Sequence, residues 1–227
     1  MIFQFELSKE LLSEKVTNFL RKKILLGEYE DGFHFSETEL AKSLNVSRGP
    51  VRDAIRQLET EGLVQTPSNG RTFVTGFSQT DLSDLFEIRK MLEKKAIGLI
   101  VRRRPDRDLS ILQQIVHHSQ SADERGLVIK LDVMFHFELM KLSGNRTLIK
   151  MWSVLRGPIH TLIDITSDNY MKLDQVPKEH EELIRLIQSG FESEACELLE
   201  KHLDTGEQVI LERLKSRGIT IERGDQR

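Results

Sequence analysis

Three arginines recur at every fourth position of residues 47–58, namely Arg48, Arg52 and Arg56. In an α-helix this spacing places the three side chains along one side, with a drift of about 40° per step. The same stretch supplies apolar residues for another side of the helix, namely Ala54, Ile55 and Leu58. A short helix divided in this way fits the major groove of DNA, because arginine bonds both phosphates and guanine edges.

The residues before this helix predict a helix-turn-helix. Ser47 stands where a helix N-cap is expected, and Pro50 lies in the first turn, where its missing N–H costs nothing. Residues 36–44 begin with a Ser-x-x-Glu capping box and predict a preceding two-turn helix. Asn45 and Val46 then form the tight turn between the two helices.

The residues after the arginine helix predict a wing. Gly62 ends the helix, and the strand-like runs 63–66 and 71–74 flank the turn signal Pro-Ser-Asn-Gly at 67–70. Arg71 lies near the tip of this hairpin. The alternative is an ordinary amphipathic surface helix with solvated arginines. The joint occurrence of cap, turn, arginine spacing and hairpin favours DNA binding.

These motifs resemble those of the GntR family of bacterial winged-helix transcription regulators. The resemblance rests on Ser-Glu-x-Glu-Leu-Ala at 36–41, Val-Ser-Arg-x-Pro-Val-Arg-x-Ala-Ile at 46–55 and Leu-Glu-x-Glu-Gly-Leu-Val at 58–64. It implies that the arginine helix contacts an operator and that the wing assists. The candidate DNA-binding residues are Ser47, Arg48, Gly49, Arg52, Arg56, Asn69, Gly70 and Arg71.

Two positions depart from the family pattern. Many members carry threonine where Gly49 stands, and some carry a DNA-contacting arginine at the position of Thr38. The corresponding side-chain contacts therefore do not transfer to this chain. Residues 1–74 also hold ten lysines and arginines against eleven acidic residues, and the whole chain has a net charge of −3. The DNA-binding prediction therefore depends on local clustering of arginines and not on overall charge.

Length and composition bound the rest of the chain. The 227 residues suffice for two domains, which we expect at 1–75 (DNA binding) and 76–227 (effector binding and dimerisation). The sequence contains no run of 18 apolar residues, so we expect no transmembrane helix. The first residues lack the features of a signal peptide, and the lone Cys196 excludes an intramolecular disulfide. We therefore expect a cytoplasmic protein that does not contact membranes.

The second half of the chain reads almost entirely as helix. Pro105, Gly144, Pro177 and Gly190 interrupt the apolar periodicity. Between these breaks, helical spacing runs through residues 79–103, 107–122, 125–143, 145–168, 178–189 and 191–216. This pattern predicts an all-α bundle of six or seven helices. The expected fold class is therefore mainly α, with an N-terminal winged helix-turn-helix followed by an all-α helical bundle effector domain.

Four residues of this half could bind a metal ion. Asp132 and His136 lie four apart, and hence on one helical face, within an unusually apolar run. His180 and His202 lie in two later predicted helices. One carboxylate with three imidazoles suits zinc, nickel, manganese or iron. Spacing alone also allows surface or satisfied core histidines, and a simple hydrogen bond within the Asp132–His136 pair.

Residues 79–213 also resemble the all-helical effector domain of the FadR subfamily of GntR regulators. The shared motifs are Arg-x-x-Leu-Glu at 89–93, Asp-Val-Met-Phe-His at 132–136, Ser-Gly-Asn at 143–145, Glu-His at 179–180 and Lys-His-Leu at 201–203. In the metal-binding branch an aspartate and three histidines converge in the bundle. The resemblance implies that a divalent ion, with zinc first, binds at Asp132, His136, His180 and His202.

The resemblance further implies a small carboxylate or sugar acid as effector, bound directly by the metal. Arg89, Asn145 and Arg156 are candidate effector-binding residues. Other roles are equally open, because Arg89 can pair with Glu93 or a neighbouring helix and Asn145 can cap a helix. The sequence leaves these roles undecided.

The chain is therefore predicted to be a ligand-responsive repressor that binds double-stranded DNA as a homodimer, and not an enzyme. The sequence lacks a His-Glu-x-x-His motif, a nucleophile elbow and a glycine-rich phosphate loop. One alternative is a metal-dependent hydrolase or oxygenase-type enzyme fused to a DNA-binding head. The other is a constitutive DNA-binding protein with a structural metal.

Overall fold

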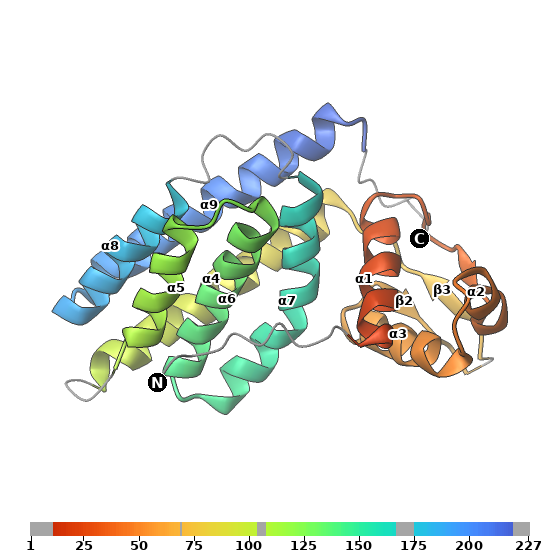
Figure 1. Cartoon of the computed structure of the whole chain (residues 1–227), viewed down its shortest axis with the longest axis horizontal. Helices are drawn as coiled ribbons and strands as arrows, with labels where there is room; N and C mark the ends of the chain where they lie inside the picture. Colours follow the sequence, from red (N-terminus) through yellow and green to blue (C-terminus); the bar gives the residue numbers. More distant parts are fainter. Residues whose placement is uncertain (1–10, 69, 104–107, 167–174, 220–227) are drawn as a thin grey trace. The chain divides into compact units, whose positions relative to one another are not determined.

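The computed structural model describes residues 11–68, 70–103, 108–166 and 175–219 (Figure 1). Within these ranges the chain forms nine α-helices and three short strands, and it divides into two compact units between Phe77 and Ser78. This architecture confirms the expected mainly α fold class. Among the described helices, none combines the length and the apolar character needed to cross a membrane.

The first unit contains a three-helix core. Helix α1 packs along α3, and Leu20, Leu25 and Leu58 are fully or almost fully buried there. The sequence analysis predicted the second and third helices but did not predict the first. The three helices are α1 (Leu12–Leu25), α2 (Glu37–Ser43) and α3 (Arg48–Thr60).

The turn between α2 and α3 is the predicted one. Asn45 adopts a left-handed conformation with φ of 53°, which asparagine tolerates better than most residues. The Ser36 hydroxyl caps α2 by accepting a hydrogen bond from the Glu39 amide at 3.3 Å. Ser47 occupies the N-cap position of α3 as expected, but its hydroxyl accepts no hydrogen bond from the helix.

The predicted hairpin is part of a three-stranded antiparallel sheet. Strands β2 (Val64–Gln65) and β3 (Thr72–Val74) pair with Val64 opposite Val74. A third strand, β1 (His34–Phe35), pairs with the other side of β3, which gives the order β1-β3-β2. Gly70 precedes β3 with a φ of 74°, a conformation that favours glycine. Asn69 lies outside the described residues.

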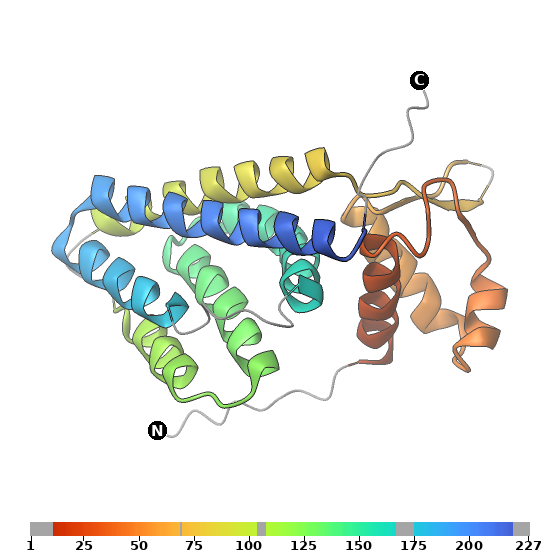
Figure 2. The ribbon, with the colours of Figure 1, turned by 90° about the horizontal axis from the view of Figure 1, so that it is seen from above.

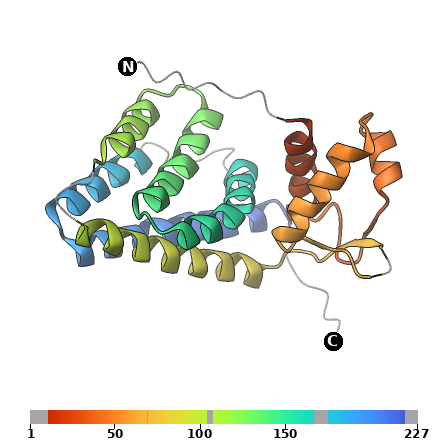
Figure 3. The ribbon, with the colours of Figure 1, turned by 90° about the horizontal axis from the view of Figure 1, so that it is seen from below.

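The second unit is a helical bundle in which α4 and α9 lie side by side and run in opposite directions (Figure 2). Helices α5, α6 and α8 pack together on one side of this pair (Figures 2 and 3). The six helices predicted from periodicity are confirmed, and their ends agree to within three residues. They are α4 (Gln79–Arg102), α5 (Ser110–Gln120), α6 (Arg125–Leu142), α7 (Arg146–Thr166), α8 (Val176–Ser189) and α9 (Glu192–Ser216).

Two local features position the bundle helices that carry polar residues. At the start of α4 a capping box joins Ser78 and Asp81, because each side chain accepts a hydrogen bond from the other's backbone amide, at 3.1 and 2.8 Å. At the end of α8, Gly190 adopts a left-handed φ of 82° and reverses the chain into α9. This reversal brings His180 of α8 and His202 of α9 to the same side of the bundle.

Candidate functional site

Four side chains from three helices converge inside the bundle. Asp132 and His136 come from α6, His180 from α8 and His202 from α9, and one ligand atom of each lies within 4.8 Å of all the others. The Oδ1 atom of Asp132 lies 3.7, 3.5 and 4.0 Å from the Nε2 atoms of the three histidines, in sequence order. The structure therefore brings together all four residues that the sequence analysis selected as metal ligands.

The donor set and its spacing fit a divalent metal ion. The ligand atoms of a four-coordinate zinc lie about 3.3 Å apart, so the observed distances leave room for an ion after small side-chain shifts. The Nε2 atoms of His136 and His180 are buried and have no hydrogen-bond partner. Buried unpaired polar atoms are rare and cost about 1–3 kcal/mol each. Both nitrogens point into the cluster, where an ion would satisfy them.

Two of the histidines are oriented by carboxylates on their far side. His136 Nδ1 lies 2.5 Å from an oxygen of Glu93, and His202 Nδ1 lies 2.6 Å from an oxygen of Glu179. When Nδ1–H donates to a carboxylate, the Nε2 lone pair is left for a metal. The sequence analysis missed these roles for Glu93 and Glu179. The only signal for Glu179 was its position beside His180.

Glu93 is fully buried and collects hydrogen bonds from three side chains. Besides His136, it accepts bonds from Arg89 Nε and Trp152 Nε1, both at 2.8 Å. Burial alone would raise the pKa of this carboxyl, but His136 and Arg89 outweigh that effect and hold its pKa below the ordinary value. Glu93 is therefore a buried carboxylate anion that ties α4 to α6 and α7.

The environment keeps two of the imidazoles neutral. Burial lowers the pKa of His136, although Glu93 partly opposes the shift, and burial lowers the pKa of His180 well below its ordinary value. The His180 ring also stacks on Phe135 with the ring centroids 3.8 Å apart. Neutral imidazole is the form that binds metal ions.

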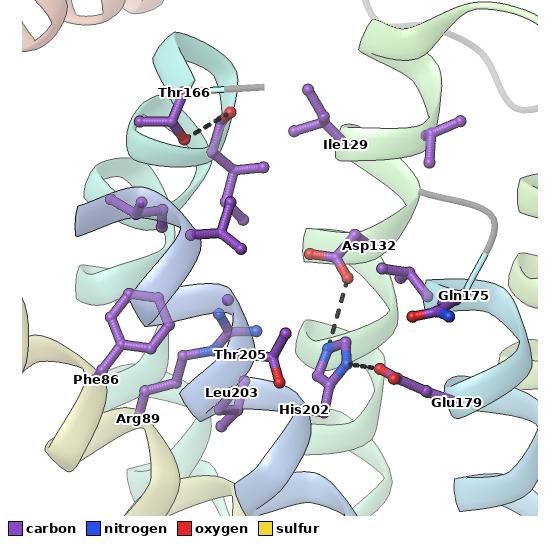
Figure 4. A pocket seen from close by; sticks show the side chains of 16 residues that line it. Phe86, Arg89, Ile129, Asp132, Thr166, Gln175, Glu179, His202, Leu203 and Thr205 are labelled. Carbon is purple, nitrogen blue, oxygen red and sulfur yellow. Dashed lines mark hydrogen bonds and ion pairs between the residues drawn. The ribbon is translucent and has the colours of Figure 1, made fainter. Parts of the chain in front are cut away.

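A cavity of about 80 Å³ lies against the cluster (Figure 4). Asp132 and His202 reach its wall from the metal side, and Arg89 points into it from α4. The Nη2 atom of Arg89 is buried without a hydrogen-bond partner. An anion in this cavity could therefore contact both Arg89 and a metal at the cluster. Most other wall residues are apolar, including Phe86, Val128, Ile129, Ile163, Leu203, Val209 and Ile210.

The three effector-binding candidates have different positions. Arg89 lines the cavity and also pairs with Glu93, so the two roles considered for it are compatible. Asn145 caps α7, since its side-chain oxygen accepts hydrogen bonds from two backbone amides at 3.0 and 3.2 Å. The Arg156 guanidinium lies over the Phe137 ring, 5.0 Å from its centroid. Neither Asn145 nor Arg156 is among the residues that line the cavity, and effector binding by them stays a prediction.

The first unit carries a groove of about 560 Å³ between α3, the end of the wing and the start of α2. The arginine row of α3 lies along it, together with Gly70 and Arg71 of the wing. Ser47 and Gly49 are exposed at the start of α3. DNA contact by these residues stays a prediction, which this shared surface supports.

An acidic residue that the sequence analysis did not select also lies in this groove. Glu37 of α2 accepts hydrogen bonds from Arg48 and Arg52 at 3.3 and 3.2 Å. The hydrogen bond from Arg52 is the main cause that lowers the pKa of Glu37. Glu37 therefore holds two of the three arginine side chains in place on the exposed surface.

Comparison with protein families gives two matches. The model described as bacterial regulatory proteins, gntR family, matches residues 12–74, and the model described as FCD domain matches residues 84–205. The second match alone covers more than half of the chain. Together the two matches correspond to the two units of the structure.

Individual relatives agree with this result. An uncharacterized HTH-type transcriptional regulator, YdhC, of Bacillus subtilis (strain 168) is 29% identical over 176 residues, covering 75% of this chain and 78% of that protein. The Nta operon transcriptional regulator of Aminobacter aminovorans is 36% identical over 124 residues, covering 54% of this chain and 59% of that protein. Both names describe transcription regulators and not enzymes.

Solved structures share the fold. McbR/YncC of E. coli superposes with a TM-score of 0.67 at 20% identity, covering 89% of this chain and 98% of that chain. A GntR family member from Pseudomonas syringae pv. tomato str. DC3000 gives 0.56 at 26% identity, covering 93% of this chain and 89% of that chain. The resemblance found in the sequence is thus confirmed, and the chain belongs to the gntR family of bacterial regulatory proteins, with an FCD domain following its DNA-binding domain.

Proposed function

We propose that this transcription regulator is a repressor that binds a divalent metal ion and responds to a small carboxylate. Asp132, His136, His180 and His202 hold the ion, with zinc first and nickel, manganese or iron as alternatives. The observation that carries the proposal is the convergence of these four side chains around two buried, unpaired imidazole nitrogens. When bound, the ion would supply a positive charge and, on expanding beyond its four protein ligands, a position for a carboxylate oxygen.

The effector is held from two sides. Its carboxylate contacts the ion and also the unpaired Nη2 of Arg89. Arg89 is already fixed by Glu93, so little side-chain entropy is lost when the effector binds. The cavity beside the cluster favours this reading over a purely structural metal, because a structural ion needs neither a cavity nor an unpaired arginine.

The first unit binds operator DNA through α3 and the wing. Its contact residues are Ser47, Arg48, Gly49, Arg52, Arg56, Asn69, Gly70 and Arg71. A homodimer places two such surfaces on the half-sites of an operator with two-fold symmetry. The apolar side chains of Ile88 and Met91 on α4, 42% and 61% exposed, support self-association.

The proposal of repression follows the printed names of relatives. The Gluconate operon transcriptional repressor of Bacillus subtilis (strain 168) is 23% identical over 206 residues, covering 87% of this chain and 84% of that protein. An effector relieves repression only if it prefers one arrangement of the dimer over another. It must bind more tightly to the arrangement that does not fit the operator than to the arrangement that does. We place this regulation in the cytoplasm, where the chromosome lies.

Elemental analysis of the purified full-length chain tests the metal site. We expect about one zinc, nickel, manganese or iron ion per chain, and a loss of most of it in His202→Ala. The exposed His117 on α5 provides a matched control, because His117→Ala removes an imidazole outside the cluster. A metal-free wild-type protein, purified without chelator, would refute the metal site and leave DNA binding unaffected.

A further inference from the structure

We infer that the cavity beside the metal site takes a small monocarboxylate with a branched apolar tail, and neither a sugar acid nor a diacid. The inference rests on the proposed function, in which the effector carboxylate contacts the metal and Arg89. It narrows the chemical class of that effector. Four observations support this inference: the apolar wall of the cavity, the hydrogen bonds already made by its hydroxyl groups, the charges of its side chains, and the volume of the cavity.

The wall that faces away from the metal is apolar. Phe86 contributes from α4, Val128 and Ile129 from α6, Ile163 from α7, and Val209 and Ile210 from α9. Figure 4 shows Phe86 and Ile129 on opposite sides of the space into which Arg89 and Asp132 point. An apolar tail gains free energy by leaving water for such a surface, whereas a hydroxyl loses hydrogen bonds there.

The two hydroxyl groups among the described wall residues already donate hydrogen bonds. Thr166 Oγ1 donates to the Leu162 carbonyl at 2.7 Å, and Thr205 Oγ1 donates to the Lys201 carbonyl at 2.8 Å. Each bond lies within the residue's own helix, so neither proton is offered to a ligand. Gln175 supplies an amide, but its side chain is exposed. A ligand with several hydroxyls would therefore leave some of them unpaired.

The charges in the wall suit one carboxylate. Among the described wall residues, Arg89 is the one lysine or arginine, while Asp132 and Glu179 are acidic. The ion and Arg89 attract a first carboxylate. A second carboxylate would enter a region whose described residues are apolar or acidic and include no further lysine or arginine, which disfavours diacids.

The size of the cavity limits the tail. A cavity of about 150 Å³ lined by apolar residues accommodates benzene. The cavity here, at about 80 Å³, suits three or four carbon atoms beyond the carboxylate. 3-Methylbutanoate has such a tail and is branched like the side chains around it.

Calorimetric titration of the zinc-loaded full-length protein tests this class. The ligands are 3-methylbutanoate, 3-hydroxybutanoate, in which a hydroxyl replaces one methyl, and succinate, which carries a second carboxylate. We expect 3-methylbutanoate to bind about 10- to 100-fold more tightly than its hydroxyl counterpart, and succinate to bind more weakly than 3-methylbutanoate.

A wall variant links the preference to this cavity. Val209→Thr keeps the side-chain shape but replaces a wall methyl by a hydroxyl, so 3-methylbutanoate loses an apolar contact and the preference for it should fall several-fold. Val154→Thr makes the same exchange on α7 outside the wall and should leave the preference unchanged. An unchanged preference in Val209→Thr would overturn the assignment of the tail to this cavity.

The outcomes distinguish failure of the inferred ligand class from failure of the proposed carboxylate effector. If 3-hydroxybutanoate or succinate binds as tightly as 3-methylbutanoate, the inferred class is wrong and the carboxylate effector stands. If none of the three produces a binding heat at millimolar concentration, the carboxylate effector itself is overturned together with the class. Tightest binding of 3-methylbutanoate, reduced in Val209→Thr alone, supports both.

Discussion

At the scale of single residues, Glu93 is the centre of the buried polar network. Its two oxygens accept hydrogen bonds from Arg89, His136 and Trp152, which belong to three different helices. Every donor meets the same carboxylate, so a change at Glu93 affects both His136 of the histidine cluster and Arg89 at the cavity. Buried carboxylates with this number of partners are costly to disrupt.

Replacing this carboxylate by a neutral amide should reduce both stability and metal affinity. In Glu93→Gln the Arg89 guanidinium stays buried without its counter-charge, and we expect a loss of about 2–4 kcal/mol in urea unfolding. Loss of the His136 partner should weaken zinc binding about 10- to 100-fold. Glu87→Gln, on the exposed side of the same helix α4, is the matched control and should change neither quantity. A Glu93→Gln protein with wild-type zinc affinity would contradict the orienting role.

In the first unit, Arg52→Ala should weaken DNA binding while leaving metal content unchanged. Arg52 is 49% exposed in the groove and is held by Glu37. If Arg52 contacts a phosphate, its loss should reduce the slope of log affinity against log salt concentration by about one. If Arg52 contacts a guanine, its loss should instead relax the sequence specificity at one base pair. Binding to DNA selected from a random duplex library, measured over a salt series, distinguishes the two. Arg185→Ala on α8 is the control. Equal DNA affinity of the two variants would refute the assignment of α3 as the DNA-binding helix.

At the scale of elements, the hairpin of α8 and α9 determines whether His180 and His202 meet. Its turn depends on Gly190, whose φ of 82° is unfavourable for residues with a Cβ atom. Each helix also buries an apolar face, with Leu183 and Ile184 on α8 and Leu199 and Leu203 on α9. The turn therefore fixes where α9 begins and in which direction it runs, and the apolar packing fixes its rotation about its own axis.

Two glycine-to-alanine changes should have opposite effects on stability. Gly190→Ala forces a Cβ atom into a left-handed conformation and should destabilise the protein by about 1 kcal/mol. Gly49 lies in the first turn of α3, and a Cβ atom there would meet nothing within 4 Å. Gly49→Ala should therefore be neutral or stabilise by up to about 1 kcal/mol. Thermal unfolding of both variants gives the comparison, and a stable Gly190→Ala protein would contradict the role of the turn.

The bundle helices were predictable from their long repeating pattern and the helix-turn-helix and hairpin from their cap and turn residues, whereas helix α1 and strand β1 were not predicted. The six bundle helices repeat their apolar pattern over three or more turns, which is why periodicity located them. Helix α1 shows Val16, Leu20 and Ile24 at every fourth position, a signal that was available but not used. Strand β1 has only two residues, so its existence depends on pairing with β3, far along the chain.

The same distinction applies to the proposed metal site. Its four ligands were identified through family motifs, not through their spacing alone. The orienting bonds from Glu93 to His136 and from Glu179 to His202 join residues on different helices. No local pattern marks such pairs, because they depend on how the helices pack.

At the scale of the whole molecule, the two units hold different kinds of chemistry. The metal cluster and its cavity belong entirely to the second unit, and the arginine groove belongs entirely to the first. An ion that binds only the folded protein stabilises it by about 2.7 kcal/mol when its concentration is 100 times its Kd. This stabilisation should therefore appear in the unfolding of the second unit.

Removal of the metal with a chelator should lower the melting temperature of that unit. We expect a decrease of roughly 5–10 °C in differential scanning calorimetry, which zinc addition reverses. The His202→Ala protein serves as the control, since it lacks one ligand and should show little response to chelator. A wild-type melting curve that does not respond to chelator would show that no stabilising ion is bound.

Helix α4 begins at Gln79, directly after the first unit ends, and carries both Arg89 and Glu93. Ten residues separate Gln79 from Arg89, which corresponds to about 15 Å of continuous helix. The capping box at Ser78 stabilises the first turn of this helix, so α4 is expected to be continuous and stiff from Gln79 onward. A small tilt of α4 at Arg89 would therefore be carried along the helix to its first turn at Gln79.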